Sequence, residues 1–231
     1  MDKRQRGIVK IKKSRPIQQI IEDQVNKWKS SLPHKEEKKI TVVAISRQAG
    51  SGGHILAQQL AQKLSFDFFD QEITQAVAED AHMRTLMVES LDEKGISAID
   101  DIISAVVEKH HLWGYEYMQH LLRVIATIGK HGNAVILGRG GNFILPREEI
   151  LRVRAIAPLA VRVKNIAEWL RLSSEQAKEY IQKIELERKD FIKKYFKADI
   201  NDPENNDLVI NLEKLSIETA VEIVKAALKS S

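Results

Sequence analysis

The stretch that decides the fold is ITVVAISRQAGSGGHILAQQLAQKL, residues 40–64. An apolar run comes first, the small residues 50–53 follow, and apolar residues at helical spacing complete the stretch. This order predicts a strand, a glycine-rich turn and the start of a helix. Backbone N–H groups of such a turn can converge on one point, where the helix dipole favours an anion. The stretch predicts a phosphate site, although a glycine turn that only joins a strand to a helix has the same pattern.

The turn departs from the P-loop consensus G-x-x-x-x-G-K-[ST] at three positions. Aligned with that consensus, Arg47 stands at the first glycine, Gly53 at the lysine and His54 at the hydroxyl residue. The backbone cradle is kept, but the two side chains that usually assist phosphoryl transfer are replaced. From the residues alone, phosphate binding is therefore better supported than phosphoryl transfer.

Length and composition favour one globular core. The chain has 231 residues, of which 43% are hydrophobic, enough for a sizeable core with or without an appendage. It contains no run of 18 apolar residues and no apolar N-terminal segment, so we expect neither a membrane span nor a secretory signal. The absence of cysteine excludes disulfides, Cys-ligated zinc and thiol catalysis. We expect a cytoplasmic protein.

The charge is divided unevenly along the chain. Residues 1–40 carry 12 Lys and Arg against 5 Asp and Glu, a net charge of +7, whereas the remainder carries 24 against 27. We therefore expect a basic arm over residues 1–39 and a core domain over residues 40–231. A solvated extension is the commonest role of such an arm. Because no aromatic platform accompanies its basic residues, we expect no nucleic-acid partner.

The arm contains one predicted amphipathic helix. Its apolar stripe consists of Ile17, Ile20, Ile21, Val25 and Trp28. Such a stripe needs a partner. The partner is either the core of the same chain or a second copy, which would make a homodimer through the N-terminal helix. Residues 30–39 then predict a linker.

The rest of the chain alternates short strands with helical segments. Beyond the strand before the glycine turn, strands are expected at residues 66–69, 134–137, 151–156 and 208–211. Helical segments are expected at 71–81, in an insert over 82–130 with two helices, in a polar helix pair over 172–197 and at 217–228. Five strands separated by helices predict an α/β fold with a five-stranded parallel sheet flanked by helices. No metal-ligating residues are assigned.

Three residues outside the glycine turn are candidates for ligand contact. Asp70 follows a strand whose carboxyl end should face the ligand crevice, and it could equally cap the next helix. Arg139 follows another strand in a glycine-rich loop, where a guanidinium can reach a phosphate bidentately. Arg188 lies in the charged segment 172–197, whose composition suits either a solvated helix or a lid that closes over phosphates.

Over about residues 40–230 the chain resembles the nucleoside monophosphate kinase group, and most closely the cytidylate kinase-like proteins. The resemblance rests on Ile45-Ser46-Arg47 before Gly50-Ser51-Gly52-Gly53, Phe69-Asp70-Gln71-Glu72-Ile73, Ile136-Leu137-Gly138-Arg139-Gly140, Ala157-Pro158-Leu159 with Arg162, Glu187-Arg188, and Asp202-Pro203 before Asp207-Leu208-Val209-Ile210-Asn211. It implies a P-loop NTPase-like fold with a helical insert and a helical lid. It also implies Mg²⁺-assisted transfer of a phosphoryl group from ATP to a nucleoside monophosphate, with CMP as the acceptor.

The resemblance also implies roles for individual residues. Gly50, Ser51, Gly52 and Gly53 would hold donor phosphates, Arg162 would lie near the donor nucleotide, Asp70 and Arg139 would face the acceptor, and Arg188 would act from the lid. Cytidylate kinases carry a lysine where Gly53 stands, whereas the kinase-like branch resembles this chain in carrying glycine. Leu186 and Trp169 stand where that branch commonly has lysine and arginine.

Two hypotheses follow. In a working kinase, Arg47, His54 or a lid cation would replace the missing lysine. The alternative is a nucleotide-binding sensor or scaffold protein that kept the cradle and lost the chemistry, with the basic arm recruiting a partner.

Overall fold

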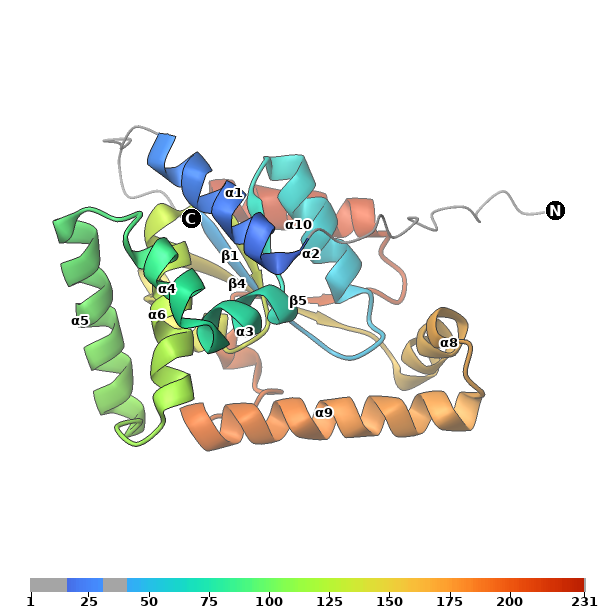
Figure 1. Cartoon of the computed structure of the whole chain (residues 1–231). Coiled ribbons are helices and arrows are strands. Elements are labelled where there is room, and N and C mark those ends of the chain that lie inside the picture. Colours follow the sequence, from blue (N-terminus) through green and yellow to red (C-terminus); the bar gives the residue numbers. More distant parts are fainter. Residues whose placement is uncertain (1–15, 31–40, 231) are drawn as a thin grey trace.

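The central strand of the sheet is β1 (Val42–Arg47), whose first four residues are buried. The computed structural model describes residues 16–30 and 41–230. In them β1 pairs with β3 (Ala134–Leu137) on one side and β4 (Ile150–Ile156) on the other. With β2 (Asp67–Phe69) and β5 (Leu208–Asn211) they form a five-stranded sheet in the order β2-β3-β1-β4-β5 (Figure 1). Every pairing is parallel, which confirms the predicted fold class.

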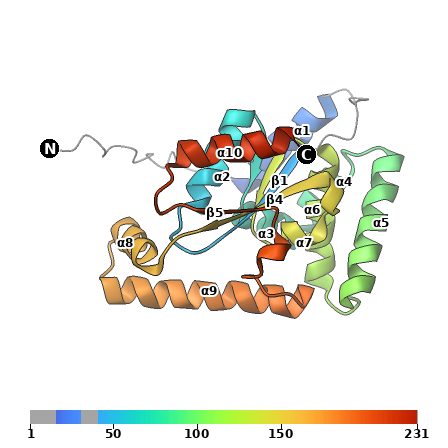
Figure 2. The same ribbon diagram turned by 180° about the vertical axis from the view of Figure 1, so that it is seen from behind.

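Helices cover both faces of the sheet because both faces are apolar. Val43 and Ile45 of β1 belong to a core that includes α2 (Gly53–Leu64) and α10 (Ile217–Lys229), the pair lying over the sheet in Figure 2. The alternate residues Val42 and Ala44 belong to the opposite core. The other helices are α1 (Ile17–Ser30), α3 (Gln71–Glu79), α4 (Ala81–Val88), α5 (Glu93–His110), α6 (Glu116–His131), α7 (Gly141–Ile144), α8 (Leu159–Leu170) and α9 (Ser174–Phe196), with short 3-10 turns at Arg147–Glu149 and Pro203–Asn205.

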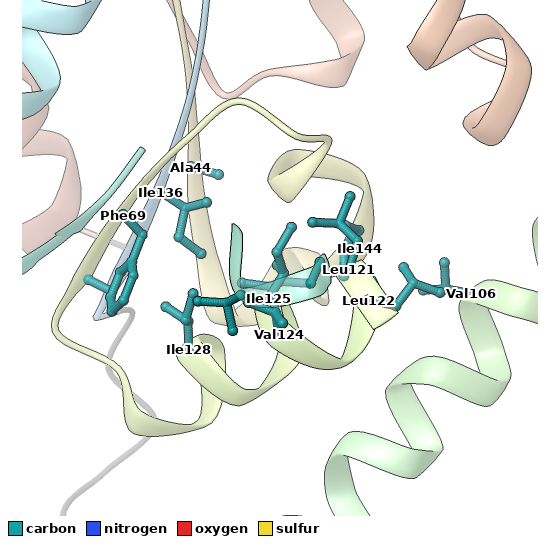
Figure 3. Close-up of a cluster of buried hydrophobic side chains, with 14 of the residues drawn as sticks. Ala44, Phe69, Val106, Leu121, Leu122, Val124, Ile125, Ile128, Ile136 and Ile144 are labelled. Atoms are coloured by element: carbon teal, nitrogen blue, oxygen red, sulfur yellow. The ribbon is translucent and has the colours of Figure 1, made fainter. Parts of the chain in front are cut away.

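The second core joins the sheet to the helical insert. In Figure 3, Leu121, Ile125 and Ile128 of α6 gather with Ala44, Phe69 and Ile136 of the sheet. Val106 of α5 lies beside Leu122 on the outer side of α6. Burial of these large apolar side chains fixes α6 against the sheet. Helix α5 packs on the side of α6 that faces away from the sheet.

The apolar stripe of α1 is covered by the body of the same chain. Ile21, Val25 and Trp28 are buried in the core that also contains Phe69 and α6 residues. A homodimer through this helix stays a prediction, and it would have to use the outer face of α1. The linker over residues 31–39 and residues 1–15 of the basic arm lie outside the described residues.

The division of the chain into helices differs from the sequence-based expectation. The predicted helix over 71–81 is two helices, because Asp80 ends α3 and its side chain accepts from Met83 N to cap α4. The insert accordingly has three helices, α4, α5 and α6, instead of two.

The predicted helix pair over 172–197 is wrong, since α9 is one continuous helix of 23 residues. Ser173 and Gln176 form a capping box at its start, and the helix contains neither glycine nor proline to interrupt it. Over the described ranges, no helix has the length and apolar character needed to cross a membrane.

Candidate functional site

Loops that follow three parallel strands meet at one edge of the sheet. The glycine loop, residues 48–53, follows β1 and leads into α2. Asp70 and Gln71 follow β2, and residues 138–140 follow β3. Parallel strands all end at the same edge, which is where open α/β sheets bind ligands. The long helix α9 runs along this edge in Figure 1. Its Glu185 contacts Ala49 in the glycine loop, and its Arg188 contacts the carbonyl of Arg47 at the end of β1.

The glycine loop leads into the N-terminus of α2 without a side-chain cap. Gly50 and Gly52 have φ angles of +78° and +90°, a region that glycine adopts without strain. The hydroxyl of Ser51, a buried residue, accepts from Gly53 N at 3.3 Å. Gly52, the residue before α2, has no side chain to cap the helix, so among the first amides of α2 the contact of Gly53 N with Ser51 stands in place of an N-cap. These amides and the positive end of the helix dipole are suited to an anionic ligand.

Arg47 lies at the centre of the site. Its Nη2 donates to Oε1 of Gln71 at 3.4 Å, and its carbonyl accepts from Nη1 of Arg188 at 3.0 Å. Burial, together with the neighbouring positive charges of Arg188 and Arg139, lowers the pKa of Arg47 to about 9, while Asp70 and Glu185 act in the opposite direction. Arg47 is therefore still a cation at neutral pH. The structure thus brings Arg47, Arg139 and Arg188 into one electrostatic group.

Asp70 performs the capping role that the sequence left open. Its Oδ1 accepts from Glu72 N and Ile73 N, both at 2.9 Å, which caps α3. The carboxylate also interacts electrostatically with Arg47 and His54. Capping uses Oδ1 of this side chain, and the substrate role of Asp70 stays a prediction.

Two of the predicted site arginines have a donor with no acceptor among the described residues. Arg139 Nε and Arg162 Nη1 are buried nitrogens with no hydrogen-bond acceptor among the described residues. Arg162 Nε donates to the Ala157 carbonyl at 3.0 Å, and Asn165 of the same helix donates to the Gly50 carbonyl at 2.8 Å. Buried donors usually have partners. These two nitrogens fit a ligand rich in oxygen, such as a nucleoside phosphate.

His54 lies toward the side of the site. Its ring packs edge-on against Phe68, with ring centroids 5.8 Å apart, and burial lowers its pKa. It is therefore placed beside β2 and Asp70, and its role as a lysine substitute stays a prediction.

Glu185 on α9 is a site residue that the sequence analysis missed. Its Oε1 accepts from the backbone N–H of Ala49 in the glycine loop at 2.7 Å, and Arg188 Nη1 lies 3.6 Å from the same oxygen. The carboxylate thus occupies an amide of the loop that we expect to hold phosphate. Its spacing of three residues before Arg188 was the only signal in the sequence.

Arg154 on β4 was missed as well. It is 3% exposed, and its guanidinium donates to Asn201 Oδ1 at 2.9 Å and to Ser46 Oγ at 3.4 Å. Burial lowers its pKa, and Arg188 and Arg162 are among its charged neighbours. The neighbouring Arg152 is instead paired with Asp207. The signal was two arginines in an otherwise apolar strand, which is unusual because arginine is rarely buried without a partner.

Comparison with known proteins matches the part of the chain that holds this site. Residues 42–214 match the model of the cytidylate kinase-like family. A "Cytidylate kinase" from Staphylothermus marinus is 29% identical over 192 residues, which cover 80% of this chain and 95% of that protein. Another "Cytidylate kinase", from Ignicoccus hospitalis, is 28% identical and covers 82% of this chain and 99% of that protein.

The fold is also similar to a solved structure. The crystal structure of an uncharacterized protein from Eubacterium ventriosum superposes with a TM-score of 0.68 at 20% identity. The match covers 84% of this chain and all of that chain. At this identity the likeness concerns the fold alone.

Proposed function

Because the chain belongs to the cytidylate kinase-like family, we propose that it transfers the γ-phosphoryl group of ATP to a nucleoside monophosphate, with CMP as the acceptor. The observation that carries this proposal is the gathering of Arg47, Arg139 and Arg188 beside the glycine loop. Positive charge held in place before the reaction stabilises the charge spread over a phosphoryl group in transfer. A cytoplasmic location, suggested by the cysteine-free sequence, is part of the proposal.

The donor side of the proposed site consists of the glycine loop and Arg162. Backbone amides of Gly50, Ser51, Gly52 and Gly53 would hold the phosphates of ATP. Nη1 of Arg162, which has no acceptor in the described part of the chain, would donate to the same nucleotide. Mg²⁺, when bound, would neutralise and orient the donor phosphates. Its preference for one or two carboxylates together with phosphate oxygens fits Asp70, whose carboxylate interacts with Arg47.

The acceptor side consists of Asp70 and Arg139. In the proposed reaction an oxygen of the acceptor phosphate forms a bond with the γ-phosphorus of ATP, and the bond to the β–γ bridging oxygen breaks. The products are ADP and a nucleoside diphosphate, with no change in oxidation state. Arg139 would hold the acceptor phosphate, and Arg188 would stabilise the group in transfer from α9, which also excludes water.

The alternative function is a nucleotide-binding sensor or scaffold. It is favoured by the loss of the lysine and hydroxyl residues at positions 53 and 54, and by the carboxylate of Glu185 on the glycine loop. A sensor needs the phosphate cradle but not the charge compensation of the transition state.

Calorimetry and a turnover assay distinguish these functions. ATP·Mg²⁺ and CMP are titrated separately into the full chain, and ADP release is then followed by a coupled assay with each common nucleoside monophosphate. We expect both ligands to bind and ADP release to depend on CMP. Binding without ADP release would support the sensor or scaffold, and binding of neither ligand would contradict both functions.

A further inference from the structure

Relative to the P-loop consensus, the glycine and the cationic residue have changed places between positions 47 and 53. The consensus has glycine at the position of Arg47 and lysine at the position of Gly53. Gly53 is the first residue of α2 and is not among the residues with positive φ, so backbone conformation does not require glycine there. Space does require it, because an added Cβ would lie 2.5 Å from Cβ of Arg47 and 2.9 Å from Cβ of Ala155. The root of the Arg47 side chain thus fills the space beside Gly53.

The far end of the Arg47 side chain is accommodated by a second glycine. A Cβ at Gly138, in the loop after β3, would overlap Nη1 of Arg47. Nη2 of the Arg47 guanidinium donates to Oε1 of Gln71 at the start of α3. The Arg47 side chain therefore runs from Gly53, at the end of the glycine loop, to the loop of Arg139 after β3, with its guanidinium beside Gly138 and Gln71. This is the region between the proposed donor and acceptor phosphates.

The other two candidates to replace the lysine are placed differently. His54 lies with its ring against Phe68, and Arg188 reaches the backbone carbonyl of Arg47 from α9. By contrast, the side chain of Arg47 lies where a Cβ added at Gly53 would be placed.

We infer that Arg47 supplies, from the end of β1, the phosphate-binding cation that a P-loop lysine supplies from the start of the helix, and that Gly53 and Gly138 make room for it. This inference rests on the proposed function, since it assigns a residue to the phosphates of that reaction. A guanidinium can bind two phosphate oxygens at once, whereas a lysine acts as a point charge. One arginine between the two loops can therefore contact donor and acceptor phosphates together.

The test exchanges the two residues. Arg47→Met and Arg47→Gly remove the cation, Gly53→Lys adds the consensus lysine, and the double variant Arg47→Gly with Gly53→Lys restores both consensus residues. Affinity for ATP·Mg²⁺ is measured by calorimetry, and kcat/KM by ADP release with CMP. We expect Arg47→Met to lower kcat/KM about a hundredfold or more, and Arg47→Lys to lose less.

The double variant gives the decisive comparison. We expect it to bind ATP·Mg²⁺ at least tenfold more tightly than Arg47→Gly alone, because the lysine then enters the space that Arg47 leaves. Gly53→Lys alone should bind more weakly than the wild type, because its side chain meets that of Arg47. The rescue is read together with the loss in folded Arg47→Met, because a consensus lysine binds phosphate even where Arg47 has only a structural role. Arg123→Met serves as the matched control, since Arg123 pairs with Asp100 on the insert, outside the site.

Folding is checked for each variant by thermal melting. A folded Arg47→Met protein with wild-type affinity and wild-type kcat/KM would overturn the inference and leave the proposed function intact. A double variant that binds no better than Arg47→Gly would overturn it as well. A wild-type protein that binds ATP·Mg²⁺ but releases no ADP would overturn the kinase proposal alone, because affinity still tests Arg47. A wild-type protein that binds no nucleotide would overturn both.

Discussion

At the scale of single residues, Arg139 is held in place before any ligand arrives. Its backbone has a φ of +51°, which non-glycine residues adopt uncommonly. Its guanidinium donates to Gln75 Oε1 and lies over the ring of Phe191, 5.7 Å from the centroid. Its Nε has no acceptor among the described residues. Backbone, hydrogen bond and ring contact thus orient one free donor, as expected of a preorganised binding residue.

Replacing Arg139 by alanine should weaken CMP binding with little effect on folding. A hydrogen bond between a guanidinium and a phosphate contributes about 1.5–3 kcal/mol, so we expect the Kd for CMP to rise about tenfold to a hundredfold. Calorimetry measures the Kd, and thermal melting measures the stability. Arg139→Lys is the matched variant, which keeps the charge and should lose less affinity. Unchanged affinity in a normally stable Arg139→Ala protein would remove Arg139 from the site.

At the scale of elements, α9 brings one anion and one cation to the glycine loop. Glu185 and Arg188 are three residues apart and therefore lie on the same face of the helix. Their contacts, to Ala49 N at 2.7 Å and to the Arg47 carbonyl at 3.0 Å, hold the helix against the loop. Burial lowers the pKa of Arg188, and the adjacent Glu185 opposes that effect. In the absence of a ligand, the carboxylate partly balances the charge of the arginines.

Removing the charge of Glu185 should tighten nucleotide binding. Glutamine keeps an oxygen that accepts from Ala49 N but loses the charge that repels phosphate, so Glu185→Gln should lower the Kd for ATP·Mg²⁺ about threefold to tenfold, equivalent to roughly 1 kcal/mol for a partly exposed charge. Calorimetry at two salt concentrations checks the result, because added salt screens the repulsion and should shrink the difference. Glu179→Gln, at an exposed position on the same helix, is the control. Weaker binding by Glu185→Gln would instead show that the carboxylate supports the site.

At the scale of the whole molecule, one histidine connects the N-terminal helix to the core. The ring of Trp28 on α1 stacks on His131 at the end of α6, with centroids 3.8 Å apart and planes 6° apart. His131 Nε2 also lies 2.8 Å from the hydroxyl of Ser90. On the same side, Gln24 and Lys27 of α1 reach Asp67 at 2.7 Å and 2.6 Å. The imidazole of His131 thus packs directly against the docked helix α1.

This contact should make stability depend on pH. Burial lowers the pKa of His131 to about 4, against an ordinary value of 6.5, although Asp67 acts in the opposite direction. Between these two values the unfolded chain binds the proton and the folded protein does not, so stability falls as the pH falls. We expect the contribution of His131 to be complete above pH 6.5 and to decline from there toward pH 4.

Urea unfolding at pH 7, 6 and 5 measures this effect. His131→Phe keeps an aromatic ring for Trp28 and cannot titrate, so its stability should change less over this range than that of the wild type. His82→Gln is the control, because His82 is exposed on α4. Equal pH dependence in the wild type and His131→Phe would contradict the prediction.

The sequence alone determined the features that neighbouring residues control. The strand, glycine turn and helix of residues 42–64, the strands at 134–137 and 208–211, and the terminal helix were readable because strand and helix periodicity, turn glycines and caps act over a few residues. The parallel sheet followed from the alternation of these elements. The site residues were proposed from their positions after strands and from family resemblance, and their roles stay predictions.

Only the tertiary structure decided how distant residues share one space. Glu185 meets Ala49 across 136 residues of chain, and Gly53 is small because of a side chain that begins at Arg47 and ends beside Gly138. The continuous α9 also packs against the glycine loop, which no local pattern records. Such contacts depend on which surfaces the folded sheet and helices bring together. The same local sequence pattern is compatible with different long-range contacts. For that reason the sequence showed a missing lysine and three candidate replacements, and the folded chain placed the side chain of Arg47 beside Gly53.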